Sequence, residues 1–235
     1  MQFKRTQYAD IQTIEVENNE PDLTIVMLHG YGADASDLAP LAEHIKVERK
    51  VRWLFPEGIQ QIPIGPGWFG RAWFPIDFEA IERARRSGKE RDLSGAAPQG
   101  FTEAREKLMQ MLAAARLDLS KTILCGFSQG SMMSVDLTLR LPVSTLGLGI
   151  LSGTLVNIGE TETLAKNRPE YNFFQSHGIQ DPVLPFSMAE KLNKTLNNAG
   201  MRGNLLSFPG GHEIPQSVIT GFSEYIQNQI EKAEQ

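Results

Sequence analysis

A serine between two glycines is the residue of this sequence that most suggests chemistry. Residues 126–130 read Gly-Phe-Ser-Gln-Gly, which fits the pattern G-x-S-x-G between an apolar run and a helix-forming segment. A serine at such a turn needs a strained backbone to project its hydroxyl, and the glycines let neighbouring elements approach closely. The pattern predicts that Ser128 is a nucleophile. The alternative is an ordinary turn in which Ser128 caps the following helix.

A serine hydroxyl needs a base to become nucleophilic. The sequence has four histidines: His29, His44, His177 and His212. Where this serine turn occurs, the acid and then the base follow the serine along the chain, so His177 and His212 are the candidates. Asp181 follows one predicted strand and His212 follows the last one. Chain order therefore predicts a triad of Ser128, Asp181 and His212, whereas the alternative assigns Asp181 to a turn and His212 to a surface loop.

Acyl transfer passes through an oxyanion, which backbone N–H groups stabilise. The N–H of Gln129, directly after the serine, is one predicted donor. The other is the N–H of Tyr31, because Gly30 and Gly32 allow this early loop to turn inward. His29 is expected to support the same loop through hydrogen bonds rather than to act as the base.

Apolar runs that end in glycine-containing turns predict the strands that must position these residues. The runs are residues 23–29, 51–55, 122–127, 146–151, 172–176 and 204–208. Continuous hydrophobicity is typical of strands buried on both faces of a largely parallel sheet. The segments between them predict helices over about 37–45, with Asp37 as the cap, and over 101–116, 129–140, 186–198 and 216–230. This alternation predicts an α/β fold with helices on both sheet faces.

Three segments do not follow this alternation of apolar strands and helical segments. Residues 11–16 alternate in polarity, which favours an antiparallel edge strand. Residues 58–78, rich in glycine, proline and aromatic side chains, are interpreted as a loop over the end of the sheet. Residues 79–95 carry charges of both signs and are expected to form a solvated surface, with recognition of a headgroup or peptide as the alternative.

Length and charge narrow the classes of protein. The 235 residues suit a single domain over residues 1–235, because single cores extend to about 250–300 residues. The net charge of −5 argues against nucleic acid as a partner. No segment approaches the ~20 apolar residues of a spanning helix, so no stable membrane insertion is expected. Cys125 has no partner for a disulfide, and the N-terminus lacks the pattern of a signal peptide, which favours a cytoplasmic protein.

The motifs together resemble the carboxylesterase, acyl-protein thioesterase and lysophospholipase group of small α/β hydrolases. The matching blocks are residues 28–34, 71–74, 126–130, 151–153, 177–182 and 211–212. The resemblance implies an α/β-hydrolase fold without a large lid, hydrolysis of carboxylic esters or thioesters through an acyl-enzyme on Ser128, and no cofactor. It also implies that the block at 71–74 flanks the substrate groove, so Trp73 is the first candidate substrate contact, followed by Phe74 and Trp68.

Three departures from the family pattern bear on the acyl pocket, on the packing of the helix after Ser128, and on the loop over residues 58–70, whose unusual glycine, proline and aromatic content means that substrate preference is not carried over from the family. Tyr31 stands where the family usually has leucine, and Ser131 replaces the glycine common after the serine turn. A simple ester, an acylated protein and a lysophospholipid all remain candidate substrates, and homodimerisation is left open. The other classes fit less well. A metal hydrolase lacks ligand spacing such as H-E-x-x-H, a phosphate-binding loop lacks its lysine, and a hydrolase-like binding module predicts damaged motifs.

Overall fold

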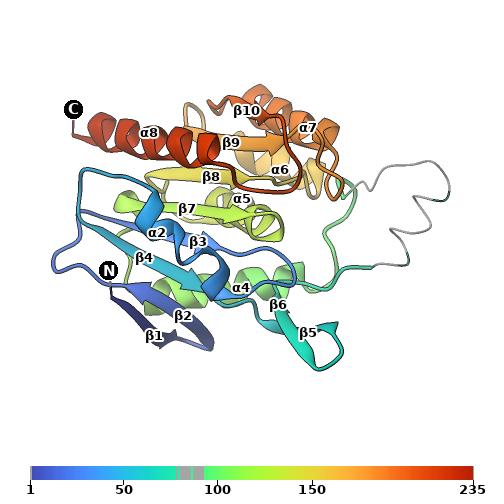
Figure 1. The fold of residues 1–235 in the computed structure, drawn as a ribbon. Coiled ribbons are helices and arrows are strands. Elements are labelled where there is room, and N and C mark those ends of the chain that lie inside the picture. The colour runs from blue at the N-terminus through green and yellow to red at the C-terminus, as the bar shows by residue number, and fades with distance from the viewer. Residues whose placement is uncertain (1, 78, 80–85, 87–92, 235) are drawn as a thin grey trace.

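The protein is organised around one twisted sheet. The computed structural model describes residues 2–77, 79, 86 and 93–234. Eight strands form the sheet in the order β1-β2-β4-β3-β7-β8-β9-β10 (Figure 1). Their bounds are β1 Phe3–Tyr8, β2 Ile11–Val16, β3 Leu23–Leu28, β4 Val51–Pro56, β7 Thr122–Phe127, β8 Gly147–Leu151, β9 Phe173–Gly178 and β10 Leu205–Phe208. Neighbours from β4 to β10 pair in parallel, which confirms the mostly parallel sheet.

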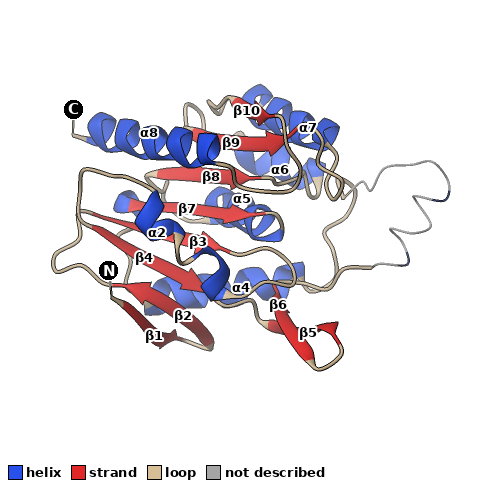
Figure 2. Cartoon of the chain, in the orientation of Figure 1, coloured by secondary structure: helices blue, strands red, loops and turns tan. Residues whose placement is uncertain are grey.

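Helices cover both faces of this sheet (Figure 2). Their bounds are α1 Ala35–Leu38, α2 Leu41–His44, α4 Phe101–Ala114, α5 Gln129–Arg140, α6 Ile158–Ala165, α7 Phe186–Asn198 and α8 Gln216–Ala233, with a short 3-10 helix at Leu119–Lys121. Alternate strand residues point to opposite faces: Val26 and Leu124 pack with α4 and α5, whereas Met27 and Cys125 pack with α1, α2 and α8. The parallel strands are therefore apolar on both faces because both are covered.

The N-terminal edge of the sheet differs from the prediction. Residues 11–16 form an antiparallel strand, but that strand is not at the edge, because β1 pairs with it from Phe3↔Val16 to Tyr8↔Ile11. β2 in turn pairs antiparallel with β4. β1 carries mostly exposed, polar side chains, so it lacks the hydrophobic pattern from which strands are predicted.

The helix predicted over about residues 37–45 is two short helices. Asp34, not Asp37, caps the first, and its carboxylate accepts a hydrogen bond from the Ser36 N–H at 2.7 Å. Pro40 lies between α1 and α2 and supplies no N–H to continue the helix. The error therefore comes from an unrecognised proline break.

The segment interpreted as a loop contains a β-hairpin, β5 (Gln60–Gly65) and β6 (Trp68–Ala72). β6 also bonds to the loop after β3, because the Gly32 N–H donates to the Arg71 carbonyl and the Arg71 N–H donates to the Ala33 carbonyl, both at 2.8 Å. Gly70 makes this approach feasible, since a Cβ there would lie 2.1 Å from the Gly32 oxygen. The hairpin is thus joined to the Tyr31 loop and projects beyond the sheet (Figure 1).

Some predictions concern residues that lie outside the described part of the chain. Most of the charged segment, residues 80–85 and 87–92, lies outside it, so its surface role and the absence of a large lid stay predictions. No helix in the described part of the chain has the length and hydropathy needed to cross a bilayer.

Candidate active site

Ser128 sits at the turn between the end of β7 and the start of α5. Its backbone adopts φ +54° and ψ −117°, a strained conformation for a residue with a side chain, costing about 1–3 kcal/mol. The Ser128 N–H donates to the Leu151 carbonyl at 2.9 Å, which anchors the turn to β8. The Ser128 side chain makes no capping bond to α5, so the alternative role as a helix cap has no support.

Close packing beneath the turn holds this conformation. A Cβ on Gly130 would lie 2.0 Å from the Leu28 carbonyl oxygen, so only glycine lets the first turn of α5 rest on the end of β3. The Ser131 hydroxyl donates to the Ser128 carbonyl at 2.7 Å. The serine that departs from the family pattern therefore adds a hydrogen bond inside the turn.

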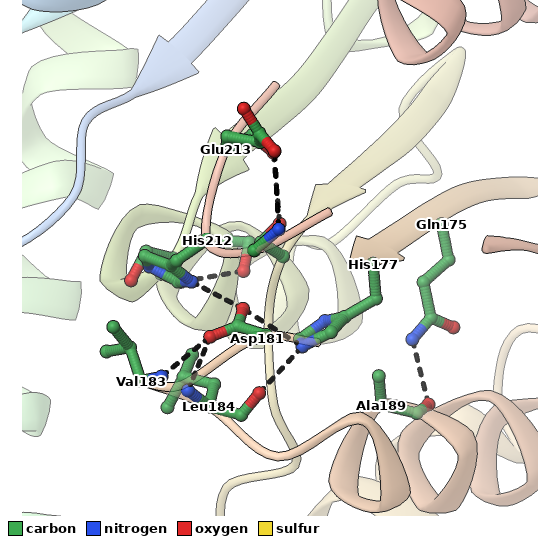
Figure 3. A network of polar contacts seen from close by, with 12 residues as sticks. Gln175, His177, Asp181, Val183, Leu184, Ala189, His212 and Glu213 are labelled. Atoms are coloured by element: carbon green, nitrogen blue, oxygen red, sulfur yellow. Dashed lines mark hydrogen bonds and ion pairs between the residues drawn. The ribbon is translucent and has the colours of Figure 1, made fainter. Parts of the chain in front are cut away.

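Asp181 and His212 form a hydrogen-bonded pair (Figure 3). His212 Nδ1 lies 2.6 Å from Asp181 Oδ2. The other carboxylate oxygen, Oδ1, accepts the N–H groups of Val183 at 2.8 Å and Leu184 at 2.9 Å. The Phe127 ring packs on the His212 ring with centroids 4.8 Å apart. The imidazole is thus fixed by a carboxylate on one edge and by an aromatic ring against it.

A second histidine, His177, contacts the same carboxylate from the buried side. His177 Nε2 lies 3.2 Å from Asp181 Oδ2 and 2.9 Å from the Leu184 carbonyl oxygen, and the side chain is fully buried. Burial by itself raises the pKa of Asp181, but the hydrogen bonds from His177 and His212 outweigh it and hold that pKa well below its usual range. Sequence reasoning considered His177 only as a possible base, and no spacing pattern indicates its contact with Asp181.

One cavity of about 460 Å³ brings most of the predicted residues together. It is lined by Tyr31, Phe74, Ile76, Ser128, Gln129, Met132, Pro182, Val183, Leu184 and His212. The predicted nucleophile, base and both predicted oxyanion donors therefore border one space. Asp181 lies behind His212, and the remaining walls are apolar. The arrangement suits attack on a carbonyl group that carries an apolar chain.

The predicted aromatic substrate contacts divide into three outcomes. Phe74 lines the cavity, as expected. Trp73 is fully buried and absent from the lining, because its indole N–H donates to the His29 carbonyl at 2.9 Å. Trp68 is 73 % exposed on β6 and is also absent from the lining. The preference for Trp73 was therefore wrong: its side chain points into the core and supports the loop after β3.

Gln129 has a side-chain role that sequence reasoning missed. Its Oε1 accepts a hydrogen bond from the main-chain N–H of Trp73 at 2.8 Å, and its Nε2 donates to the main-chain carbonyl of Phe74 at 2.7 Å. The side chain is buried, so these two bonds satisfy main-chain groups that have no access to water. Gln129 thereby joins the serine turn to the segment that forms the Phe74 wall.

His29 supports the Tyr31 loop, as predicted. The Gly58 N–H donates to His29 Nε2 at 2.9 Å, so Nε2 is unprotonated, and His29 Nδ1 donates to the Gly30 carbonyl at 2.7 Å. Burial lowers the pKa of His29 from its ordinary value of 6.5 to about 4. Both ring nitrogens are committed to the main chain, so His29 has no nitrogen left to serve as a base.

The described residues contain no group of three His, Cys, Asp or Glu side chains placed to hold a metal ion. Burial raises the pKa of the Cys125 thiol, which keeps it protonated inside the core. The predicted nucleophile and base, Ser128 and His212, both border the cavity, whereas Cys125 does not.

Comparisons with known proteins agree with this architecture. The sequence model of a family described as Phospholipase/Carboxylesterase matches residues 9–230. A probable carboxylesterase of Oryza sativa subsp. japonica is 24% identical, over 90% of this chain and 79% of the relative. Acyl-protein thioesterase 1 of Candida albicans is 24% identical, over 93% of this chain and 97% of the relative. The crystal structure of esterase PE8 superposes with a TM-score of 0.72 at 25% identity, covering 88% of this chain and 92% of that one.

Proposed function

The chain belongs to the phospholipase/carboxylesterase family, and we propose that it hydrolyses carboxylic esters or thioesters through an acyl-enzyme on Ser128. The observation that carries the proposal is the 2.6 Å contact between His212 Nδ1 and Asp181 Oδ2, with His212 bordering the same cavity as the strained Ser128. A base oriented by a carboxylate, next to a serine hydroxyl at the edge of a cavity, is the arrangement that activates a serine.

In the first half of the reaction, the Ser128 oxygen bonds to the substrate carbonyl carbon while His212 Nε2 accepts the hydroxyl proton. The carbonyl oxygen becomes an oxyanion, which the N–H groups of Tyr31 and Gln129 stabilise. The intermediate then collapses, the bond to the leaving alcohol or thiol breaks, and His212 returns the proton to that group. Asp181 stays ionised throughout and keeps His212 Nδ1 protonated.

In the second half, water attacks the acyl-enzyme. His212 Nε2 accepts a proton from the water, and a second oxyanion forms in the same place. Its collapse breaks the bond to the Ser128 oxygen, which takes back the proton from His212, and the carboxylic acid leaves. The scheme needs no metal or redox cofactor to balance atoms and electrons.

The apolar walls of the cavity favour an apolar acyl group as the part of the substrate that is bound. Phe74, Met132 and Leu184 contribute these walls. Burying each CH₂ of such a chain is worth about 0.8 kcal/mol. Simple esters, acylated proteins and lysophospholipids all carry this group, so the leaving group is what distinguishes them.

A serine-directed fluorophosphonate probe tests the proposal. The wild-type protein is expected to be labelled on Ser128, Ser128→Ala to remain unlabelled, and the exposed control Ser120→Ala to label like the wild type. No labelling of the wild type, or equal labelling of Ser128→Ala, would contradict the enzymatic role and favour a hydrolase-like binding module.

A chain-length series of p-nitrophenyl esters, compared with an acylated peptide and a lysophospholipid, then identifies the substrate class. A protein thioesterase would cleave the acylated peptide faster than the simple esters. Equal or slower cleavage of the peptide would remove that assignment and leave a carboxylesterase or lysophospholipase.

A further inference from the structure

Two imidazole rings share a single carboxylate oxygen. Asp181 Oδ2 lies 2.6 Å from His212 Nδ1 and 3.2 Å from His177 Nε2 (Figure 3). The other oxygen, Oδ1, is already occupied by the N–H groups of Val183 and Leu184. The carboxylate is therefore surrounded by N–H donors, and of its two imidazole partners His212 borders the cavity whereas His177 is fully buried.

The protonation of His177 follows from its partners. Nε2 faces two acceptors, the Asp181 carboxylate and the Leu184 carbonyl oxygen, so it carries the ring proton. Nδ1 is buried and has no hydrogen-bond partner in the described part of the chain. A proton there would be an unpaired buried donor, so the geometry favours a neutral ring that donates only through Nε2.

The neighbours of the two rings that the structure describes include Phe186, Glu213 and Tyr31. From α7, the Phe186 ring packs edge-on against His177 with centroids 6.1 Å apart. Beside His212, the Glu213 carboxylate accepts the Gly211 N–H at 3.2 Å. Tyr31 borders the same cavity as His212. Asp181 is thus the charged group in direct contact with both imidazoles.

We propose that His177 is a positioning residue that acts through Asp181 on His212. By donating to Oδ2, it fixes the direction of the carboxylate and competes with His212 for the same electron pairs. A carboxylate that accepts a second donor stabilises the His212 imidazolium less. His177 thereby lowers the pH at which His212 becomes the neutral base needed for attack by Ser128. This inference rests on the proposed function, since it assigns that base to His212.

The pH dependence of kcat/KM for ester hydrolysis tests the proposal. His177→Phe removes the donor with a ring of similar size, and we expect kcat to fall roughly tenfold with little change in KM, because orientation rather than binding is lost. The acid limb of the profile is expected to move to higher pH by about 0.4 to 1 unit, which corresponds to the net strength of one hydrogen bond.

Two variants separate positioning from a purely structural role. His177→Gln retains an N–H donor and is expected to restore the wild-type acid limb and most of kcat. His44→Gln, at an exposed histidine, is expected to leave both unchanged. An acid limb that stays in place in a folded His177→Phe, or one that His177→Gln fails to restore, contradicts the proposal.

Nitrogen-15 NMR of histidine-labelled wild-type protein provides a test that needs no variant to fold and no turnover. The ring of His177 is expected to be protonated at Nε2 wherever the protein is folded, and an Nδ1–H tautomer would overturn the proposal. Fluorophosphonate labelling of Ser128 is scored separately. A protein that shows the Nε2–H form of His177 but no labelling would contradict the proposed function, not the contact between His177 and Asp181.

Discussion

The side-chain amide of Gln129 donates to the main-chain carbonyl of Phe74 at 2.7 Å. This bond joins the residue after Ser128 to an aromatic wall of the cavity, although the two are far apart in sequence. The oxygen of the same amide accepts a hydrogen bond from the main-chain N–H of Trp73. The backbone of Gln129 and its side chain thus have separate tasks: the N–H is the proposed oxyanion donor, and the amide holds the wall in place.

Gln129→Ala is expected to destabilise the fold and weaken substrate binding. It leaves the Trp73 N–H and the Phe74 carbonyl buried without partners, at a cost of about 1–3 kcal/mol each. The backbone N–H remains, so KM for an apolar ester should rise more than kcat falls. Urea unfolding and ester kinetics measure both effects. The exposed control Gln12→Ala should change stability by less than about 0.5 kcal/mol, and an equally small effect of Gln129→Ala would refute the assignment.

His29 makes stability depend on pH. Its pKa is about 4 in the folded protein and near the ordinary 6.5 when unfolded, so the unfolded state binds the proton first as pH falls. The free energy of unfolding is highest above about pH 6.5, the pKa of His29 in the unfolded chain, and it falls as the pH drops towards about 4, the pKa in the folded protein. About 2 kcal/mol is lost by about pH 5. Urea unfolding between these limits should show a smaller slope for His29→Gln and the wild-type slope for the exposed control His44→Gln. Identical slopes for all three proteins would refute the prediction.

Met132 is expected to limit the length of the acyl chain. Its side chain lines the cavity that Ser128 and His212 border. It also lines a second, smaller cavity whose apolar walls include Phe101, Val135 and Leu192. Met132→Ala should join the two spaces and favour longer p-nitrophenyl esters by about fourfold for each additional CH₂ that becomes buried. Met133→Ala, in the core of the same helix but in neither lining, should lower stability without this change in preference. An unchanged chain-length profile in Met132→Ala would show that the side chain is not the barrier.

The two tryptophans of the hairpin region should respond differently to the same substitution. Trp73→Phe leaves a cavity and an unpaired His29 carbonyl, so the free energy of unfolding should fall by about 1–3 kcal/mol. Trp68→Phe changes an exposed side chain and should remain within about 0.5 kcal/mol of the wild type. Thermal or urea unfolding of the two variants and the wild type measures these differences in stability. A larger loss for Trp68→Phe would mean that the burial of the two side chains is reversed.

Local patterns predicted the parts of the fold and site that depend on chain order. Buried strands give continuous apolar runs, and the turns after them placed Ser128 and His212 at one edge of the sheet, where the cavity lies. The contact of His177 with Asp181 had no such signal, because it depends on the path of the turn between them. Trp73 was misassigned because its role was taken from the resemblance at residues 71–74, and a block that flanks a groove does not reveal which of its side chains face the core.

The hydrogen bonds between Arg71 and residues 32 and 33 have a mechanical consequence. They tie the loop that carries Tyr31 to β6 of the β5–β6 hairpin, whose outer end exposes Ile64, Trp68 and Phe69. A molecule that displaced this outer end would also pull on the Tyr31 loop, because Gly32 and Ala33 of that loop are hydrogen-bonded to Arg71 of β6. The predicted oxyanion donor, the Tyr31 N–H, would shift with the loop, so contact of a substrate with the hairpin would change the rate at which that substrate is cleaved.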